Sequence, residues 1–133
     1  MALRAGVGRR RGTPKEVILA ALKEAAARIG MPMEAITSLG STVFKREEQG
    51  LHEAAAELRR PLYFYANDVL QRIIEQYGLR ESDFVRQTIG IGNVCEAAAL
   101  AAGGGRMALG KTRFEKVTVA LVWQQRQEWQ ESQ

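Results

Sequence analysis

The sequence is poor in the residues that build covalent or metal-held structure. Among 133 residues it has one cysteine, Cys95, and one histidine, His52. A single cysteine cannot form an internal disulfide, which favours the reducing environment of the cytoplasm. A structural zinc site needs about four Cys or His ligands, so no metal site is expected. No Ser-His-Asp or Cys-His arrangement is visible, which argues against those forms of nucleophilic catalysis.

Long apolar runs are also missing. No stretch approaches the roughly 20 apolar residues that cross a bilayer, and the basic N-terminus lacks the apolar core of a signal peptide. We therefore expect no membrane contact and a cytoplasmic location. The 19 basic and 15 acidic residues leave a net charge of +4, which leans toward anionic partners. The basic patch is short and no basic stripe interleaved with aromatics accompanies it, so nucleic acid is the least favoured partner.

The pattern of apolar residues alternates between strand and helix character, which predicts an α/β fold. Strands are expected at residues 1–8, 36–44, 62–65, 106–109 and 117–123. Strands alternating with helices predict a single three-layer α/β/α domain with a mixed sheet of about five strands. The last two strands, connected by residues 110–113 and the residues after them, predict a C-terminal antiparallel hairpin. The domain is expected to span residues 1–123, followed by a polar tail at 124–133.

Helix starts are marked by capping residues. Thr13, followed by a proline and then a glutamate, predicts the first helix, and Asn67 and Asn93 predict two more. A fourth helix carries apolar residues at helical spacing from Leu51 and ends before Pro61. We expect His52 to lie on the surface of that helix.

Glycines and arginines gather between the first strand and the first helix. The residues are Gly6, Gly8, Arg9, Arg10, Arg11, Gly12 and Thr13. Glycine lets the backbone turn tightly and approach another group, and guanidinium groups bind carboxylates. A glycine turn before a helix N-terminus is a usual anion site, so this segment predicts a ligand with several carboxylates. The alternative is a tight turn with solvated arginines, because Gly-x-Gly alone is a weak signal.

A second Gly-x-Gly turn, at Gly90 and Gly92, leads into the helix that Asn93 is expected to cap. Glu96 follows the cap by three residues and could therefore be only a capping-box partner. The helix is rich in alanine, which lets it lie close to a sheet. Cys95 is expected to be buried there as an inert thiol, since no adjacent base is visible.

Charged residues also follow the second predicted strand. Lys45, Glu47 and Glu48 lie just past its carboxyl end, where open α/β sheets place their ligand sites. The alternative is a solvated loop, which the spacing alone favours. Lys111 adds a further cation near the end of the chain. Both glycine turns are expected along the same edge of the sheet.

In this order the motifs resemble a cobalamin biosynthesis family that comprises CobE and the C-terminal domain of CbiG. The resemblance spans roughly residues 3–122 and includes Lys111. It is carried by Gly6-Val7-Gly8, Arg10-Arg11-Gly12-Thr13, Lys45 with Glu47 to Leu51, Pro61-Leu62-Tyr63-Phe64-Tyr65, Gly90-Ile91-Gly92-Asn93-Val94-Cys95-Glu96-Ala97-Ala98-Ala99-Leu100 and Val117-Thr118-Val119-Ala120. The family commonly has cysteine at the position of Arg9, which puts in doubt any mechanism that needs a thiol in the first loop.

The resemblance implies a role in building the corrin ring. The chain is similar to the stand-alone form, CobE, which implies binding of a precorrin-type tetrapyrrole edged with carboxylates, without a cofactor. Other enzymes of the corrin pathway are possible partners. Two-domain CbiG proteins resemble hydrolases that open the δ-lactone of cobalt-precorrin-5A and release acetaldehyde. The alternative is therefore a hydrolase of that kind.

The binding hypothesis and the hydrolase hypothesis each predict a different set of functional residues. The binding reading takes its substrate contacts from Gly6, Gly8, Arg9, Arg10, Arg11, Gly12, Thr13, Lys45, Gly90, Gly92, Asn93 and Lys111. The hydrolase reading takes Glu48 and Glu96 as the carboxylates that could activate water, with Gly8 and Gly92 as backbone donors for the oxyanion.

Overall fold

Five strands form one sheet in the order β3-β2-β1-β5-β4. The structure is a computed structural model that describes residues 2–9, 11–43, 47–81 and 93–124. The strands are β1 (Leu3–Arg9), β2 (Ile36–Thr42), β3 (Leu62–Tyr65), β4 (Arg106–Phe114) and β5 (Val117–Trp123). The first three run parallel, whereas β5 is antiparallel to both β1 and β4. The predicted mixed sheet and its C-terminal hairpin are confirmed.

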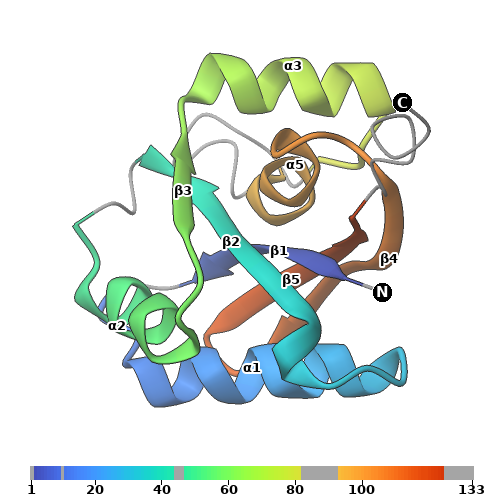
Figure 1. Ribbon diagram of the computed structural model, residues 1–133. Coiled ribbons are helices and arrows are strands. Elements are labelled where there is room, and N and C mark those ends of the chain that lie inside the picture. Colours follow the sequence, from blue (N-terminus) through green and yellow to red (C-terminus); the bar gives the residue numbers. More distant parts are fainter. Residues whose placement is uncertain (1, 10, 44–46, 82–92, 125–133) are drawn as a thin grey trace, which may run out of the picture.

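Helices cover both faces of this sheet, as Figure 1 shows. One face carries α1 (Lys15–Arg28) and α2 (Gln49–Leu58), and the other carries α3 (Asn67–Tyr77) and α5 (Val94–Ala101). A single 3-10 turn, η1 (Met33–Ala35), precedes β2. The arrangement is the predicted three-layer α/β/α domain. Within the described residues, no helix has the length and apolar character needed to cross a membrane.

β1 lies at the centre of the sheet and separates two halves of the core. Leu3, Ala5 and Val7 are buried in the half that also contains Ile18 and Leu22 of α1. Side chains alternate along a strand, so the residues between them point to the opposite face, toward α5. Burying each large aliphatic side chain contributes about 1.5–3 kcal/mol. The helical spacing of apolar residues in α1 therefore fixes which face it presents to the sheet.

α5 packs directly onto β1 at Gly6. A Cβ atom on Gly6 would overlap the carbonyl group of Cys95, and one on Gly40 of β2 would lie 3.0 Å from the carbonyl oxygen of Ala98. Ala97 and Ala98 are themselves buried. The alanine-rich face thus lets the helix approach the sheet closely, as predicted, and this contact accounts for the glycine at position 6.

The predicted glycine turn after β1 is partly wrong. Gly6 and Gly8 lie inside β1, where they pair with β5. The turn comes later, at Gly12, which has a φ of +79°. The strand continues because its alternating apolar residues remain buried as far as Val7, and this burial outweighs the weak strand propensity of glycine. β2 ends at Thr42; residue 44, the predicted end, lies outside the described residues.

Two of the three predicted helix caps are also wrong. α1 begins at Lys15 with Pro14 as its N-cap, and α3 begins at Asn67 itself with Ala66 as its N-cap; neither cap residue supplies a side-chain hydrogen bond. Thr13 lies one residue before the N-cap and is buried. Pro14 has the extended ψ of a cap residue, 159°, which moves the helix start one residue later. Asn93 does cap α5, as predicted.

The predicted connection of the final hairpin is partly wrong, because it included residues 110–113 as well as the residues after them. Residues 110–113 belong to β4, and the turn is Glu115-Lys116, between the paired residues Phe114 and Val117. Lys116 has a φ of +60°, in the left-handed region that usually selects glycine or asparagine. Gly110 gave a misleading turn signal, because it lies at an irregular part of β4.

α5 runs in the opposite direction to β1. Its first turn lies over Gly6, whereas Gly103, just past its end, lies beside Arg4 near the start of β1. The N-terminus of α5 therefore meets the carboxyl ends of the parallel strands, which is the edge where α/β sheets bind ligands.

Candidate functional site

A hollow of about 680 Å³ lies at the N-terminus of α5. The described residues that line it come from three parts of the chain: the segment after α3, the first turn of α5 and the middle of β4. They are Arg80, Glu81, Asn93, Glu96, Gly110, Lys111 and Thr112. The volume falls within the roughly 300–1,000 Å³ range of small-molecule sites.

Asn93 and Glu96 exchange two hydrogen bonds at the start of α5, one through the Glu96 backbone and one between their side chains. The Glu96 N–H donates to Asn93 Oδ1 across 3.2 Å, and Asn93 Nδ2 donates to Glu96 Oε1 across 2.7 Å. Asn93 Nδ2 also donates to the carbonyl oxygen of Arg80 across 2.8 Å. Asn93 is 2% exposed, so this amide joins α5 to the segment that brings Arg80 to the hollow.

Glu96 also joins α5 to the edge strand. Its Oε2 accepts a hydrogen bond from the backbone N–H of Lys111 across 2.6 Å. A Cβ atom on the neighbouring Gly110 would lie 3.1 Å from the same oxygen, so glycine makes room for the carboxylate. Both oxygens of Glu96 thus accept hydrogen bonds, and its carboxylate has a structural function beyond the helix cap.

The cations at the hollow are Arg80 and Lys111. Both residues are exposed, and the structure gives no ion pair for either of them among the described residues. The negative charge of Glu96 is offset by the two N–H groups that it accepts, together with the N-terminal end of α5. The arrangement suits an anionic ligand that reaches the two cations from solvent.

Cys95 lies directly behind this rim but offers no reactive thiol. It is 1% exposed, and burial raises its pKa to about 12, with the charge of Glu96 adding to the shift. The thiolate is the nucleophilic form of cysteine, and at neutral pH this thiol keeps its proton. The prediction of a buried, inert cysteine is confirmed.

A second group of predicted residues lies where β1 connects to α1. The Gly12 N–H donates to Glu48 Oε1 across 2.9 Å, and Gly50 packs so closely on Thr13 that a Cβ there would overlap the Thr13 carbonyl group. Glu48 is half-buried, and Arg11 is exposed. The turn after β1 is therefore held against the start of α2.

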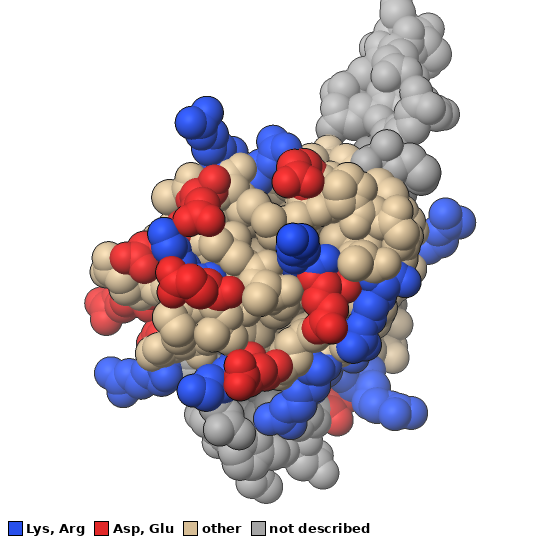
Figure 2. All heavy atoms as spheres, turned by 90° about the horizontal axis from the view of Figure 1, so that it is seen from below, with Lys and Arg blue, Asp and Glu red and all other residues tan. Residues whose placement is uncertain are grey.

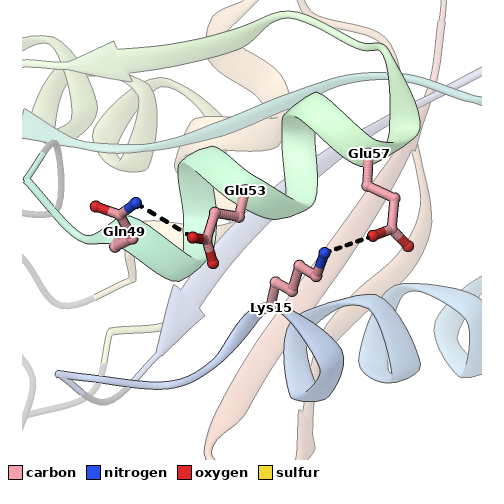
Figure 3. Close-up of polar contacts among 4 residues, drawn as sticks. All are labelled: Lys15, Gln49, Glu53 and Glu57. Carbon is pink, nitrogen blue, oxygen red and sulfur yellow. Dashed lines mark hydrogen bonds and ion pairs between the residues drawn. The ribbon is translucent and has the colours of Figure 1, made fainter.

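Polar contacts between α1 and α2 strengthen that connection, as Figure 3 shows. Lys15 Nζ lies 2.9 Å from Glu57 Oε1, and the hydrogen bond with this carboxylate raises the pKa of Lys15. Within α2, Gln49 Nε2 donates to Glu53 Oε2 across 3.2 Å. These contacts lie on the surface and hold together α1 and α2, the helices that follow Gly12 and Glu48 in the chain, rather than forming a site.

The structure thus divides the predicted site residues into two groups at one edge of the sheet. Asn93, Glu96 and Lys111 line the hollow, whereas Gly12, Thr13 and Glu48 gather at the turn after β1. Gly6 and Gly8 lie within β1 between α5 and β5. Outside the described residues are Arg10, Lys45, Gly90, Gly92 and the side chain of Arg9.

Sequence reasoning missed Arg80, Glu81, Gly110 and Thr112. Gly110 and Thr112 could have been found only by recognising residues 110–113 as strand rather than turn. Arg80 and Glu81 carry no local signal, because their place at the hollow depends on the contact between the Arg80 carbonyl group and Asn93.

Surface charge is mixed on the face formed by α1 and α2. Figure 2 shows acidic and basic side chains interspersed there, without a continuous basic surface. This face therefore lacks the electrostatic footprint that nucleic-acid binding requires. Among the described residues, no three His, Cys, Asp or Glu side chains gather in a way that could hold a metal ion.

Comparison with known proteins gives consistent matches. A family model described as the cobalamin synthesis G C-terminus matches residues 3–122. The cobalt-precorrin-5A hydrolase of Salmonella typhimurium is 31% identical over 118 residues, which are 88% of this chain and 33% of that protein. The crystal structure of CobE, a protein from the cobalamin biosynthetic pathway, is 32% identical with a TM-score of 0.82, over 90% of this chain and 91% of that one.

The crystal structure of the cobalamin biosynthesis protein ChiG from Agrobacterium tumefaciens gives a similar result. It is 30% identical with a TM-score of 0.71, over 90% of this chain and 96% of that one. The chain spans about a third of the length of the curated relatives it matches, but nearly the whole of the CobE and ChiG structures. These matches agree with the resemblance drawn from the sequence motifs.

Proposed function

Because the chain belongs to the family of the cobalamin synthesis G C-terminus, a family of cobalamin biosynthesis proteins, we propose that it binds a precorrin-type tetrapyrrole rich in carboxylates. The observation that carries the proposal is the hollow at the N-terminus of α5, with Arg80 and Lys111 at its rim. A precorrin carries several acetate and propionate arms. Cations on separate elements can each bind one of these carboxylate arms. Their separation suits a ring with several carboxylates around its edge better than a single small anion.

Affinity has to come from several such contacts together. An exposed ion pair contributes only about 0–1 kcal/mol, so neither Arg80 nor Lys111 alone holds a ligand. In our proposal the arginines that follow β1, Arg9 to Arg11, and Lys45 after β2 add contacts at the same edge of the sheet. Guanidinium groups favour this task because each can donate two parallel hydrogen bonds to one carboxylate.

The direct test is titration of the purified protein with a precorrin or cobalt-precorrin intermediate, followed by its absorption spectrum. Binding in a hollow shifts the absorption band of the ring. Lys111→Ala should raise the Kd by up to about fivefold, the value of one exposed ion pair. Lys23→Ala is the matched control, since Lys23 is an exposed lysine of α1 on the opposite face, and it should leave the Kd unchanged.

A second pair of variants tests the arginines. Replacing Arg10 and Arg11 with alanine should weaken binding while thermal stability stays nearly the same. A large loss of stability would mean that these side chains support the fold instead. An unchanged absorption spectrum for the whole series of intermediates would refute the binding proposal.

A second candidate function is hydrolysis, which the 31% identical relative named cobalt-precorrin-5A hydrolase favours. Opening a lactone needs a base for water and donors for the oxyanion. Glu96 is poorly suited as that base, because both of its oxygens already accept hydrogen bonds. Glu48 is half-buried beside Gly12 and is the better candidate. Acetaldehyde released from a lactone-containing precorrin by this chain, and lost in Glu48→Gln, would favour hydrolysis over binding alone.

A further inference from the structure

Arg4 of β1 is a buried arginine with unused hydrogen-bond donors. It is 8% exposed. In the part of the chain that the structure describes, its Nε and Nη2 atoms are the buried side-chain nitrogens and oxygens that lack a hydrogen-bond partner. A buried donor left unpaired is costly, and more so when it belongs to a charged group. Native structures keep such a group where something else satisfies it.

The surroundings of Arg4 are built from backbone and from tyrosines. Cβ atoms on Gly103 and Gly105 would lie 2.9 Å from Nη1 and 3.2 Å from Nη2, respectively. Glycine at these two positions therefore leaves the space that the guanidinium occupies. Tyr65 and Tyr77 lie close enough to interact with its charge. None of these neighbours carries a carboxylate, and the structure gives Arg4 no ion pair among the described residues.

The two unpaired atoms are the ones that a carboxylate uses. The Nε–H group and one N–H group of Nη2 lie in the guanidinium plane and point in parallel from the same edge of it. Their spacing matches the two oxygens of a carboxylate group. We propose that Arg4 is the centre of a second ligand site, which takes the carboxylate of an external small molecule in this side-on geometry. Tyr65 and Tyr77, which interact with the charge of Arg4, carry hydroxyl groups that could serve as further neutral donors.

This site is separate from the hollow at the N-terminus of α5. Arg4 pairs with Ser38 and Val122 near the start of β1, whereas the hollow lies toward the other end of α5. Burial lowers the pKa of Arg4, and the two tyrosines oppose that shift. Arginine nonetheless keeps its charge in proteins, so the guanidinium stays ready to bind an anion at any working pH.

In our proposal a carboxylate reaches Arg4 past the glycine segment that follows α5, because Gly103 and Gly105 lie against the guanidinium group. Gly103, Gly104 and Gly105 have φ angles of +144°, +75° and +123° and carry no side chains. Because the two nitrogens are covered, a carboxylate enters only when this segment shifts. Glycine adopts such backbone conformations readily, so the chain has its most adaptable residues where the site must open.

The test uses the whole chain, with sodium acetate as the probe and sodium chloride at equal ionic strength as the reference. The Nε–H signal of Arg4 in a ¹⁵N–¹H spectrum should move with acetate and reach a plateau, and should not move with chloride. Acetate at about ten times its Kd should raise the melting temperature by roughly 5 °C. A signal that does not respond to acetate, or responds equally to chloride, would overturn the proposal.

Variants distinguish the effect of the two parallel donors of Arg4 from the effect of its positive charge. Arg4→Lys keeps the charge but has no pair of parallel donors, and it should lose the acetate-dependent rise in melting temperature. Arg106→Lys is the matched control, because Arg106 is exposed at the start of β4, and it should keep the rise. If Arg4→Lys fails to fold, the titration of the unchanged chain still decides the question.

The sequence after Gln124 contains two further carboxylates of the chain itself. Gln124, whose N–H donates to the carbonyl oxygen of Ala2, is followed by a segment that contains Glu128 and Glu131. In our proposal, replacing both glutamates with glutamine leaves the Arg4 signal and its acetate response unchanged. If the Arg4 signal moves on this replacement and does not respond to acetate, the carboxylate that binds Arg4 belongs to the chain itself. That result would overturn the proposal of an external ligand.

Discussion

The carboxylate of Glu96 in α5 accepts a hydrogen bond from the backbone N–H of Lys111 in β4 across 2.6 Å. β4 has one more residue than β5 on this stretch, because Leu109 pairs with Leu121 and Thr112 with Val119. An extra residue in a strand leaves backbone groups unpaired in the ladder, and Glu96 satisfies one of them. The same side chain therefore fixes both the first turn of a helix and the shape of the edge strand at the rim of the hollow.

Replacing Glu96 with glutamine tests this double function. A glutamine has one acceptor and one donor group, so either Asn93 Nδ2 or the Lys111 N–H would face a second donor. We expect the free energy of unfolding to fall by about 1–3 kcal/mol, measured by urea denaturation. Tetrapyrrole binding should weaken as well, because Lys111 is no longer held in place.

Glu53→Gln is the control for this change. Glu53 is exposed on α2 and accepts a hydrogen bond from Gln49, so its replacement should change stability by no more than about 0.5 kcal/mol. Equal stabilities for the two variants would show that the Glu96 contacts contribute nothing.

Asn93 allows its two functions to be separated. Asn93→Asp keeps the oxygen that caps α5 but loses the N–H groups donated to Glu96 and to the Arg80 carbonyl group. Asn93→Ala loses the cap as well, which costs about 0.5–2 kcal/mol. Both variants should be destabilised at neutral pH, since the aspartate also meets the charge of Glu96.

Lowering the pH distinguishes the two Asn93 variants. Protonation of either carboxylate restores a donor between residues 93 and 96, so Asn93→Asp should regain stability relative to Asn93→Ala as the pH falls toward 4. Urea denaturation at pH 7 and pH 4 measures the difference. A constant difference in the free energy of unfolding between the two variants from pH 7 to pH 4 would exclude an interaction between the side chains of residues 93 and 96.

The fold could be predicted from local signals wherever the spacing of apolar residues along the chain matches the side chains that become buried. The short apolar run with Leu3 and Val7 predicted β1, and the spacing of Asn93 and Glu96 predicted the start of α5. The Glu96 contact with Lys111 could not be predicted, because it depends on where β4 gains its extra residue. The full length of β4 was missed because Gly110 suggested a turn, whereas the observed turn contains Lys116, which takes a positive φ without being glycine.

The candidate site was predicted only in part, because some of its residues carry a local signal and others depend on long-range contacts. Asn93 and Lys111 carry local signals, a cap and a charge, and the structure brings both to the hollow. Arg80 enters it only through a backbone contact with Asn93, which no spacing reveals. Arg4 looks like an ordinary strand residue in the sequence, and its unpaired donors become visible only when the neighbouring glycines are placed.

Two glycines of β1 should respond differently to alanine. A Cβ on Gly6 would overlap the carbonyl group of Cys95, which is backbone, whereas one on Gly8 would meet only the Thr118 hydroxyl oxygen, at 2.6 Å. A side chain can rotate away but a helix must shift, so Gly6→Ala should lose at least about 1–3 kcal/mol of stability. Gly8→Ala should lose clearly less in the same urea measurement. A reversed order would mean that α5 does not pack on β1 at Gly6.

Cys95 gives a prediction about alkaline stability. Its pKa rises from an ordinary 9.0 to about 12 in the folded protein, so between those pH values the unfolded chain loses a proton that the native state keeps. Stability therefore falls as pH rises above about 9, with a slope that approaches 1.4 kcal/mol per pH unit, and below pH 9 this group has no effect. Cys95→Ala should lack that part of the slope in urea denaturation between pH 8 and pH 10.5, whatever its stability at pH 8. Iodoacetamide should label the native thiol at pH 8 far more slowly than the unfolded one, and equal slopes or rapid native labelling would contradict the buried, protonated thiol.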